Sequence, residues 1–324
     1  MSRNIVVTGG SGFIGSHLCT ALALMPDVER IFVLDVRPPA LALPKVEHVE
    51  VDLRKPLEWC PPVPITTCFH LAAVCREPGY PWDDYFGANY LGTRTVVDWA
   101  ERVGIQNIVF TSTVMVFQAG EACRSEADLP NADTGYGISK ALAEEVLRAW
   151  RSRDAHRRLR VVRPGVVFGC RGGGNYVSLY RALKRNLFCY VGRSSTIKSS
   201  IYVKDLVRLL LAVETDRSDL DTFHGVYPAP TTIRAICEAF SETYGWRRFI
   251  PVLPMKLLRI AALPFQAADA VGLRNPVHYR RIEKLYYSTH LSAANLATIG
   301  FQAQYTLAEA IRDWRKDCRN LPLY

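Results

Sequence analysis

Two residues four positions apart, Tyr136 and Lys140, have the types and spacing that most directly suggest chemistry in this chain. Four residues are about one helical turn, so on a helix both side chains lie on one face. An ammonium about 4 Å from a phenolate stabilises it by about 4 kcal/mol at an effective dielectric near 20. This pair predicts a tyrosine whose pKa is lowered by roughly two or three units and which can take a proton from an alcohol.

Three hydroxyl residues, Thr111, Ser112 and Thr113, end the strand that is expected before Tyr136. Strand ends in a doubly wound sheet line the ligand crevice. There Thr113 would hydrogen-bond the reacting oxygen of a substrate, and Thr111 or Ser112 would contact a nicotinamide carboxamide. Hydroxyl residues on a strand are also explained by β-propensity and local backbone bonding alone.

Tyr180 and Lys184 repeat the same spacing. No strand end rich in hydroxyl groups precedes them. We therefore expect this second pair to belong to an ordinary amphipathic helix.

A glycine-rich turn near the start of the chain leads from a predicted strand into a predicted helix. Gly10, Gly12 and Gly15 fit G-x-G-x-x-G, and Gly9, Gly12 and Gly15 fit G-x-x-G-x-x-G. Glycines allow a tight turn, a close approach to a pyrophosphate and close packing of the helix on the sheet. The segment predicts a dinucleotide site.

Asp35 ends the next predicted strand, 20 residues after Gly15. A carboxylate at this place accepts both ribose hydroxyls of NAD and repels a 2′-phosphate. Arg37 would partly offset that repulsion, so NAD is expected and NADP stays open. Asp52 and Leu53 follow the third strand, where Asp52 suits either an adenine contact or a helix N-cap.

The first half of the chain alternates short apolar runs with longer amphipathic ones, the pattern of βαβ units and a parallel sheet. The pattern predicts a doubly wound α/β fold with a dinucleotide-binding domain over residues 1–165, to which a segment at about 199–227 returns. Residues 166–324 are expected to form mainly a smaller, irregular substrate lobe. The expected strands are 4–8, 31–35, 48–52, 67–72, 108–113 and 159–164, and the expected helices are 13–25, 85–103 and 136–150.

Composition limits the function classes. The chain has 324 residues, 49% of them hydrophobic, and a formal charge of +9, which fits a globular protein with an anionic ligand as well as one that binds nucleic acid or lipid. Its nine cysteines contain no C-x-x-C, which disfavours a zinc site and a disulfide framework and favours a cytoplasmic protein. No apolar signal core is expected before the first strand.

Residues 251–273 are apolar, but two prolines and three charged residues interrupt them, so no membrane span is expected there. A peripheral membrane contact and a buried cap helix both remain open.

Taken together, the motifs resemble the extended short-chain dehydrogenase/reductases, and within them the nucleotide-sugar epimerase/dehydratase branch. The matching segments span residues 4–206 in family order. They are Thr8-Gly-Gly-Ser-Gly-Phe-Ile-Gly15, His70-Leu-Ala-Ala73, Asn89 with Gly92-Thr93, Phe110-Thr-Ser-Thr113, Tyr136-Gly-Ile-Ser-Lys140, Arg163-Pro164 with Gly169, and Ile201-Tyr-Val-Lys-Asp-Leu206.

This resemblance implies a Rossmann domain with tightly held NAD(P), catalytic Thr113, Tyr136 and Lys140, and a lobe that binds a nucleotide diphosphate. The residues implied for the cofactor are Gly9, Gly12, Phe13, Ile14, Gly15, Asp35, Arg37, Asp52, Leu53, Leu71, Ala72, Ala73, Asn89, Thr111, Tyr136, Lys140 and Arg163. Those suggested for the substrate are Arg76, Ser112, Asn175, Lys198, Arg280 and Arg281. A homodimer through helices 85–103 and 136–150 is also implied.

Departures from the family pattern reduce the number of reactions that are expected for this chain. The 4,6-dehydratases place Asp-Glu after the catalytic Thr, whereas this chain has Val114-Met115, so dehydration is not expected. Val116-Phe117-Gln118 stands where V-Y-G is usual, which changes the substrate pocket. The leading hypothesis is an NAD-dependent nucleotide-sugar 4-epimerase. A 4-keto-6-deoxysugar reductase, a hydroxysteroid-type dehydrogenase and a non-catalytic dinucleotide-binding protein stay as alternatives.

Overall fold

The computed structural model describes residues 2–77, 79–257 and 285–318, and a seven-stranded sheet lies at its centre. The strands run in the order β11-β7-β5-β4-β1-β2-β3, and every neighbouring pair is parallel. The order reverses between β1 and β4, so the carboxyl ends of these two strands border the crevice where such sheets bind ligands. The bounds are β1 (Arg3–Thr8), β2 (Val28–Asp35), β3 (Val46–Glu50), β4 (Thr67–His70), β5 (Asn107–Thr111), β7 (Arg158–Pro164) and β11 (Thr222–Gly225).

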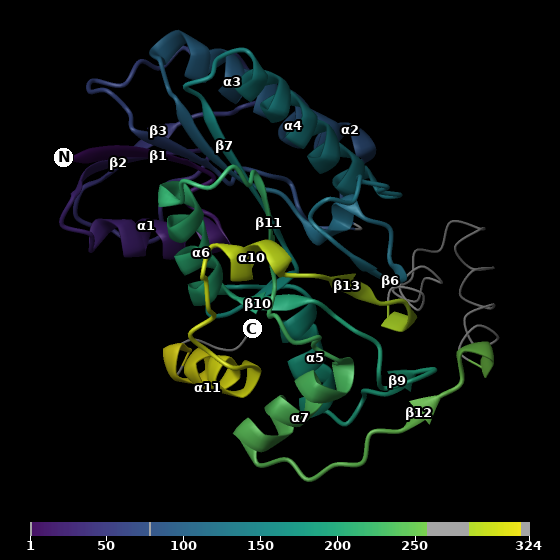
Figure 1. Cartoon of the computed structure of the whole chain (residues 1–324). Coiled ribbons are helices and arrows are strands. Elements are labelled where there is room, and N and C mark those ends of the chain that lie inside the picture. The colour runs from purple at the N-terminus through teal and green to yellow at the C-terminus, as the bar shows by residue number, and fades with distance from the viewer. Residues whose placement is uncertain (1, 78, 258–284, 319–324) are drawn as a thin grey trace.

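Helices cover both faces of the sheet, which confirms the predicted doubly wound fold (Figure 1). On one face α1 (Phe13–Ala23) and α6 (Val203–Thr215) pack against Ile5 and Val7. On the other, α3 (Gly92–Val103) and α4 (Gly135–Ser152) pack with Val6. Successive residues of a strand point to opposite faces, and a strand covered on both sides is apolar throughout.

The predicted helix over 85–103 is not uniform. It consists of α2 (Trp82–Tyr85), a π-helical segment η1 (Phe86–Leu91) and then α3. A π segment shifts the register of a helix and frequently occurs at functional sites. Here it holds Asn89, one of the predicted cofactor residues.

The strand before Tyr136 is shorter than predicted, since β5 ends at Thr111. The Ser112 N–H still donates to the Val162 carbonyl at 2.7 Å. Thr113 then caps a short 3₁₀ helix, η2 (Val114–Val116), because its hydroxyl accepts a hydrogen bond from the Met115 N–H at 3.1 Å. The cap turns the chain away from the sheet immediately after the hydroxyl residues.

The C-terminal lobe has small two-stranded sheets and a core rich in aromatic side chains, among them Phe168, Tyr176, Phe240 and Trp314. The other elements outside the main sheet and its covering helices are β6 (Gly120–Arg124), β8 (Val166–Phe168), α5 (Asn175–Lys184), β9 (Tyr190–Val191), β10 (Ser200–Tyr202), α7 (Ile233–Tyr244), β12 (Val252–Leu253), β13 (Thr289–Leu291), α10 (Ala294–Thr298) and α11 (Leu307–Asp317).

Within the described ranges, no helix is both long enough and apolar enough to cross a bilayer. Residues 251–257 of the apolar stretch are described and mostly exposed, whereas its remainder, 258–273, lies outside the described residues.

Candidate active site

Tyr136 lies in the first turn of α4, beside Thr113. The hydroxyl of Thr134 caps this helix by accepting a hydrogen bond from the Gly137 N–H at 3.1 Å, which fixes where α4 begins. The Tyr136 side chain is buried, and its phenol shares a hydrogen bond with the Thr113 hydroxyl. The structure thus joins two of the three predicted catalytic residues by a direct contact.

Lys140 follows one helical turn later and is buried. Its Nζ has no hydrogen-bond partner among the described residues and lies 3.9 Å from the centroid of the Phe110 ring. A buried amino group without a partner is unfavourable unless a ligand supplies one. This orphaned nitrogen therefore points to a polar ligand beside α4.

The predicted lowering of the Tyr136 pKa is wrong for this structure. Burial raises the pKa of Tyr136, and the hydrogen bond from Thr113 offsets only part of that rise. Burial also lowers the pKa of Lys140 to about 7, against the opposing attraction of Glu144. A charged lysine in a partly solvated site would lower the pKa of a neighbouring phenol, whereas enclosure here disfavours the charged forms of both groups.

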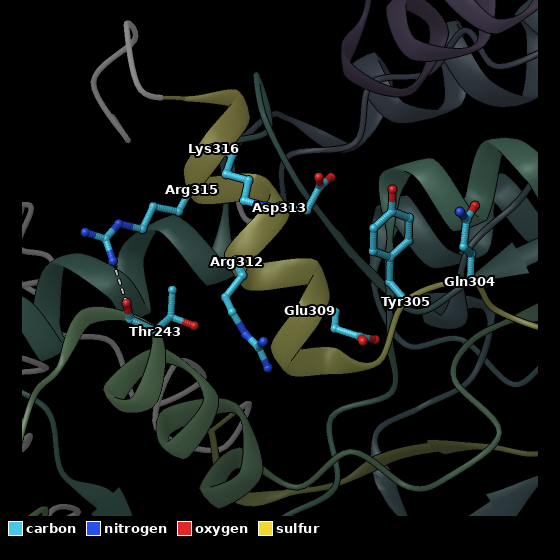
Figure 2. A pocket seen from close by; sticks show the side chains of 8 residues that line it. All are labelled: Thr243, Gln304, Tyr305, Glu309, Arg312, Asp313, Arg315 and Lys316. Atoms are coloured by element: carbon cyan, nitrogen blue, oxygen red, sulfur yellow. Dashed lines mark hydrogen bonds between the residues drawn. The ribbon is translucent and has the colours of Figure 1, made fainter.

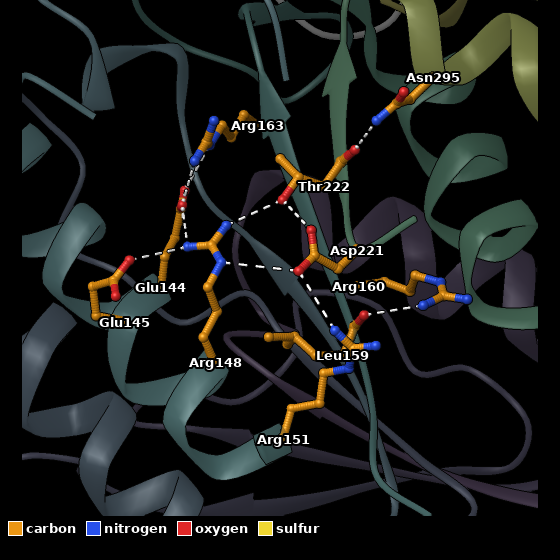
Figure 3. Close-up of polar contacts among 10 residues, drawn as sticks. All are labelled: Glu144, Glu145, Arg148, Arg151, Leu159, Arg160, Arg163, Asp221, Thr222 and Asn295. Atoms are coloured by element: carbon orange, nitrogen blue, oxygen red, sulfur yellow. Dashed lines mark hydrogen bonds and ion pairs between the residues drawn. The ribbon is translucent and has the colours of Figure 1, made fainter. Parts of the chain in front are cut away.

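Glu144, a further turn along α4, is the functional residue that the sequence analysis missed (Figure 3). Its carboxylate is fully buried and accepts two hydrogen bonds from Arg163, at 2.9 and 2.7 Å, and one from the Ser112 hydroxyl at 2.5 Å. Burial alone would raise the pKa of Glu144, but its bonds to Arg163 and Ser112 keep it below the ordinary value. A permanent negative charge therefore lies one turn from Lys140.

The signal for Glu144 was present in the sequence. Tyr136, Lys140 and Glu144 recur every four residues, so they share one face of α4. Ser112 and Arg163 were predicted to contact substrate and cofactor, respectively. In the structure both side chains bind Glu144. A contact of either residue with cofactor or substrate stays a prediction.

The glycine turn lies beside Asp35, as the spacing predicted. The Asp35 carboxylate accepts hydrogen bonds from the N–H groups of Ser11 and Arg37, both at 3.1 Å. A carboxylate has about four lone-pair positions, so two remain for a pair of ribose hydroxyls. Gly9 has a φ of +71°, and a Cβ there would lie 2.6 Å from the backbone of Ala72. Only glycine permits this approach of β1 to the segment after β4.

A buried chain of hydrogen bonds fixes the strand ends that border the crevice. His70 Nδ1 lies 2.7 Å from the Thr8 hydroxyl, and His70 Nε2 lies 2.9 Å from the Thr93 hydroxyl. The Thr93 hydroxyl donates to the Asn89 carbonyl at 2.5 Å. Burial lowers the pKa of His70 to about 3, so the ring is neutral. This chain connects β1 and β4 to the π segment.

The remaining predicted cofactor residues lie around the same strand ends. Asn89 Oδ1 accepts a hydrogen bond from the Val74 N–H at 2.8 Å, and Asn89 Nδ2 donates to the Val74 carbonyl at 3.0 Å. The same Nδ2 also donates to the Ser139 hydroxyl. Asp52 pairs with Arg54, and Leu53 is buried. Among the others, Phe13 and Ile14 begin α1, and Leu71, Ala72 and Ala73 follow β4. The buried Thr111 hydroxyl has no hydrogen-bond partner within the described part of the chain.

The suggested substrate residues are less tightly grouped. Arg76 and Asn175 are exposed, the latter at the start of α5. Lys198 donates to the Tyr287 carbonyl at 2.5 Å, and burial lowers its pKa to about 8. Arg280 and Arg281 lie outside the described residues.

Two other features do not belong to this site. A pocket of about 530 Å³ lies along α11, but it contains none of the predicted residues and its charged lining includes both signs (Figure 2). Among the residues that the structure describes, no group of three His, Cys, Asp or Glu side chains could hold a metal ion.

The described residues fit a dinucleotide. They combine the close-packed glycine turn, a carboxylate with free lone pairs and two buried polar atoms without partners, Lys140 Nζ and Thr111 Oγ1. Residues 5–224 match the model of the NAD dependent epimerase/dehydratase family. The chain belongs to this family. It is therefore an extended short-chain dehydrogenase/reductase, a class of NAD-dependent enzymes.

Similarity to individual family members extends over different shares of the chain. A 4-epimerase of N-acetyl-alpha-D-glucosaminyl-diphospho-ditrans,octacis-undecaprenol from Escherichia coli O157:H7 is 27% identical over 316 residues, covering 96% of this chain and 94% of its own. A Mycobacterium tuberculosis 3 beta-hydroxysteroid dehydrogenase/Delta 5-->4-isomerase is 29% identical over 63% of this chain and 58% of its own. The solved UDP-glucuronic acid 4-epimerase from Bacillus cereus with NAD has the same fold, with a TM-score of 0.74, 18% identity and coverage of 97% and 99%.

Proposed function

We propose that this chain is an NAD-dependent 4-epimerase of a diphosphate-linked hexose. The observation that carries the proposal is the contact of Tyr136 with Thr113, one helical turn from the unpartnered Lys140. This arrangement suits an alcohol that must lose and regain a proton at one oxygen.

In this mechanism, Tyr136 removes the proton of the C4 hydroxyl and returns it after the sugar has turned over. NAD, when bound, supplies the hydride acceptor and donor at C4. Thr113 hydrogen-bonds the C4 oxygen and holds it beside the phenol. Lys140 in its protonated form stabilises the Tyr136 phenolate, and Glu144 favours that protonated form. The absence of an Asp-Glu pair after Thr113 argues against dehydration.

The choice of NAD over NADP rests on Asp35. Its carboxylate would repel a 2′-phosphate, while its free lone pairs would accept the two ribose hydroxyls. The Arg37 N–H already binds that carboxylate, which places the backbone of Arg37 beside it. Loss of NAD preference in Asp35→Asn, measured as the ratio of the two cofactor affinities, would support this assignment.

The group joined to the sugar through the diphosphate can be either a nucleoside or a polyprenyl lipid. The family motifs of the sequence alone favour a nucleotide sugar. The relative that is similar over nearly the whole of both chains acts, by its name, on a sugar linked to undecaprenol through a diphosphate. We therefore propose the lipid-linked sugar as the second candidate substrate.

The test is C4 inversion followed by NMR, with UDP-hexoses and a short polyprenyl-diphosphate N-acetylhexosamine as parallel substrates and no added cofactor. We expect one series to invert without net change in nicotinamide absorbance. Consumption of reduced cofactor in proportion to product would instead identify a ketoreductase. Oxidation of a 3β-hydroxysteroid, without inversion of any sugar, would identify a steroid dehydrogenase.

We also propose that the enzyme is a cytoplasmic homodimer. All nine cysteines are free thiols, which suits a reducing compartment. Leu91 in η1 and Leu142 in α4 are exposed, 47% and 37%, on the helices expected to meet a second copy. Light scattering of Leu142→Glu is expected to give a monomer where the parent chain gives a dimer.

A further inference from the structure

Two neighbouring segments of the C-terminal half carry exposed side chains that are mostly apolar or basic. We name them together the ribbon face and define it as residues 184–192 and 246–257. Its backbone is held by the parallel pairing of β9 with β12, with hydrogen bonds from Tyr190 N–H to Pro251 O at 2.9 Å and from Gly192 N–H to Leu253 O at 2.8 Å. The Arg248 guanidinium donates to the Leu183 carbonyl and so ties the second segment to the end of α5.

Large apolar side chains of the ribbon face project into solvent. Phe249 is 91% exposed and Leu187 is 75% exposed, while Leu257, Val252 and Leu253 are exposed to lesser degrees. Single exposed apolar residues are ordinary, but several together on one small element usually mark an interaction surface.

The turn that presents Leu187 has a defined geometry. Asn186 adopts a left-handed conformation with φ of 56°, its N–H donates to Leu183 O at 3.1 Å, and the Leu187 N–H donates to Ala182 O at 2.9 Å. This pattern is that of a Schellman helix end, in which the residue at the place of Leu187 normally packs back on the helix. Here it remains exposed, so the turn displays an apolar side chain outward.

The charges of the ribbon face are all of one sign. Its two segments contain Lys184, Arg185, Arg247, Arg248 and Lys256, and no Asp or Glu, although the chain has 31 acidic residues. Apolar side chains with basic neighbours are complementary to an anionic bilayer, where the former enter the interface and the latter bind lipid phosphates. A single-stranded RNA would use the basic residues and stack a base on Phe249, but it would leave Leu187 and the other aliphatic side chains in water.

The ribbon face is also connected to the candidate active site. After β9, Arg193 forms an ion pair with Glu121 of β6, the strand that follows the catalytic Thr113 segment.

Figure 1 shows β9 and β12 at the opposite end of the molecule from α3. Docking through this face would therefore leave the helices of the proposed dimer free.

We propose that the ribbon face docks the enzyme on an anionic lipid bilayer, so that a lipid-linked diphosphate sugar can reach the site from the membrane. The choice of substrate in this proposal rests on the proposed function, whereas the docking itself rests on the ribbon face.

The test is co-sedimentation of the full chain with vesicles of phosphatidylcholine alone and of equal amounts of phosphatidylcholine and phosphatidylglycerol. We expect binding to the anionic vesicles that weakens with salt, and little binding to the neutral ones. Leu187→Ser with Phe249→Ser should weaken binding by about tenfold or more. The matched control, Leu24→Ser with Leu129→Ser, removes leucines that are 81% and 85% exposed elsewhere and should bind like the parent.

A second set of variants tests the basic residues of the ribbon face by reversing their charge. Lys184→Glu with Arg185→Glu should also weaken binding, whereas Arg217→Glu, an exposed arginine at another place, should not. Failure of the parent chain to bind anionic vesicles would overturn the proposal. So would loss of binding on charge reversal with full binding by the Leu187→Ser, Phe249→Ser variant, since that result describes a polyanion site.

Activity separates this proposal from the proposed function. C4 inversion of a water-soluble diphosphate sugar should be the same in the parent chain and in the Leu187→Ser, Phe249→Ser variant. Inversion without vesicle binding would overturn the docking alone, and vesicle binding without any inversion would overturn the enzymatic proposal alone.

Discussion

The chain contains the same Y-x-x-x-K spacing twice, and both tyrosines are buried on helices, but the surroundings of the two copies differ. In α4, Tyr136 contacts the Thr113 hydroxyl, and the buried Lys140 Nζ has no hydrogen-bond partner among the residues that the structure describes. In α5, the Tyr180 ring packs against Tyr244 and Trp246 at 5.0 and 5.7 Å, and Lys184 is exposed. A Y-x-x-x-K pair therefore forms a candidate site only where a strand end supplies a polar neighbour and the fold excludes water from the lysine.

The largest expected difference between the copies is in catalysis. Tyr136→Phe removes the proton acceptor and should lower kcat by about a thousandfold, within the range typical of general acid–base groups. Tyr180→Phe should leave kcat within about twofold, because that hydroxyl lies in an aromatic cluster away from the site. Steady-state inversion rates of the two variants measure the contrast. Equal losses of kcat in the two variants would contradict the assignment of Tyr136 as the proton acceptor.

The next prediction concerns Glu144, the buried carboxylate one helical turn from Lys140. Glu144→Gln leaves the buried Arg163 guanidinium without its counter-charge and should lower the free energy of unfolding by about 3 kcal/mol. Glu145→Gln, one residue along and 68% exposed, should change it by less than about 1 kcal/mol. Chemical denaturation compares them. The support we describe is absent if both variants unfold alike.

Glu144 also acts on the proton of Lys140. Its charge raises the pKa of Lys140 against the effect of burial, so its removal should shift the alkaline limb of the kcat/KM profile to lower pH. Ser112→Ala, which keeps the carboxylate and its ion pair, should leave that limb nearly in place and serves as the control if Glu144→Gln folds poorly. An unshifted limb in Glu144→Gln would show that Glu144 is structural only.

A smaller effect concerns stability against pH. Burial holds the pKa of Lys140 at about 7 in the folded protein, below the ordinary value of 10.5 for a lysine in water. Between these values the unfolded chain binds more protons, so this group makes stability rise with pH, by up to about 1.4 kcal/mol per pH unit. Lys140→Met should remove that slope, and Lys184→Met should retain it. Denaturation midpoints across this pH range provide the measurement.

Much of the fold was predictable because the strands are continuous apolar runs and glycine positions are sterically determined. The glycine turn, Asp35 and the Thr113–Tyr136 pair followed from local spacing within single βα units. Glu144 with Arg163 was not predicted, since their ion pair joins α4 to β7. The raised pKa of Tyr136 was not predicted either, because spacing gives the separation of two groups but not how far they are removed from water.

In the proposed reaction, Tyr136 removes and returns the proton of a C4 hydroxyl that Thr113 holds, while the sugar is transiently oxidised. The most direct measurement uses a substrate that carries deuterium at C4, incubated in ordinary water without added cofactor. We expect inverted product that retains its deuterium, no net cofactor consumption, and loss of the reaction in Tyr136→Phe. Deuterium lost to solvent, or undiminished inversion by Tyr136→Phe, would contradict it.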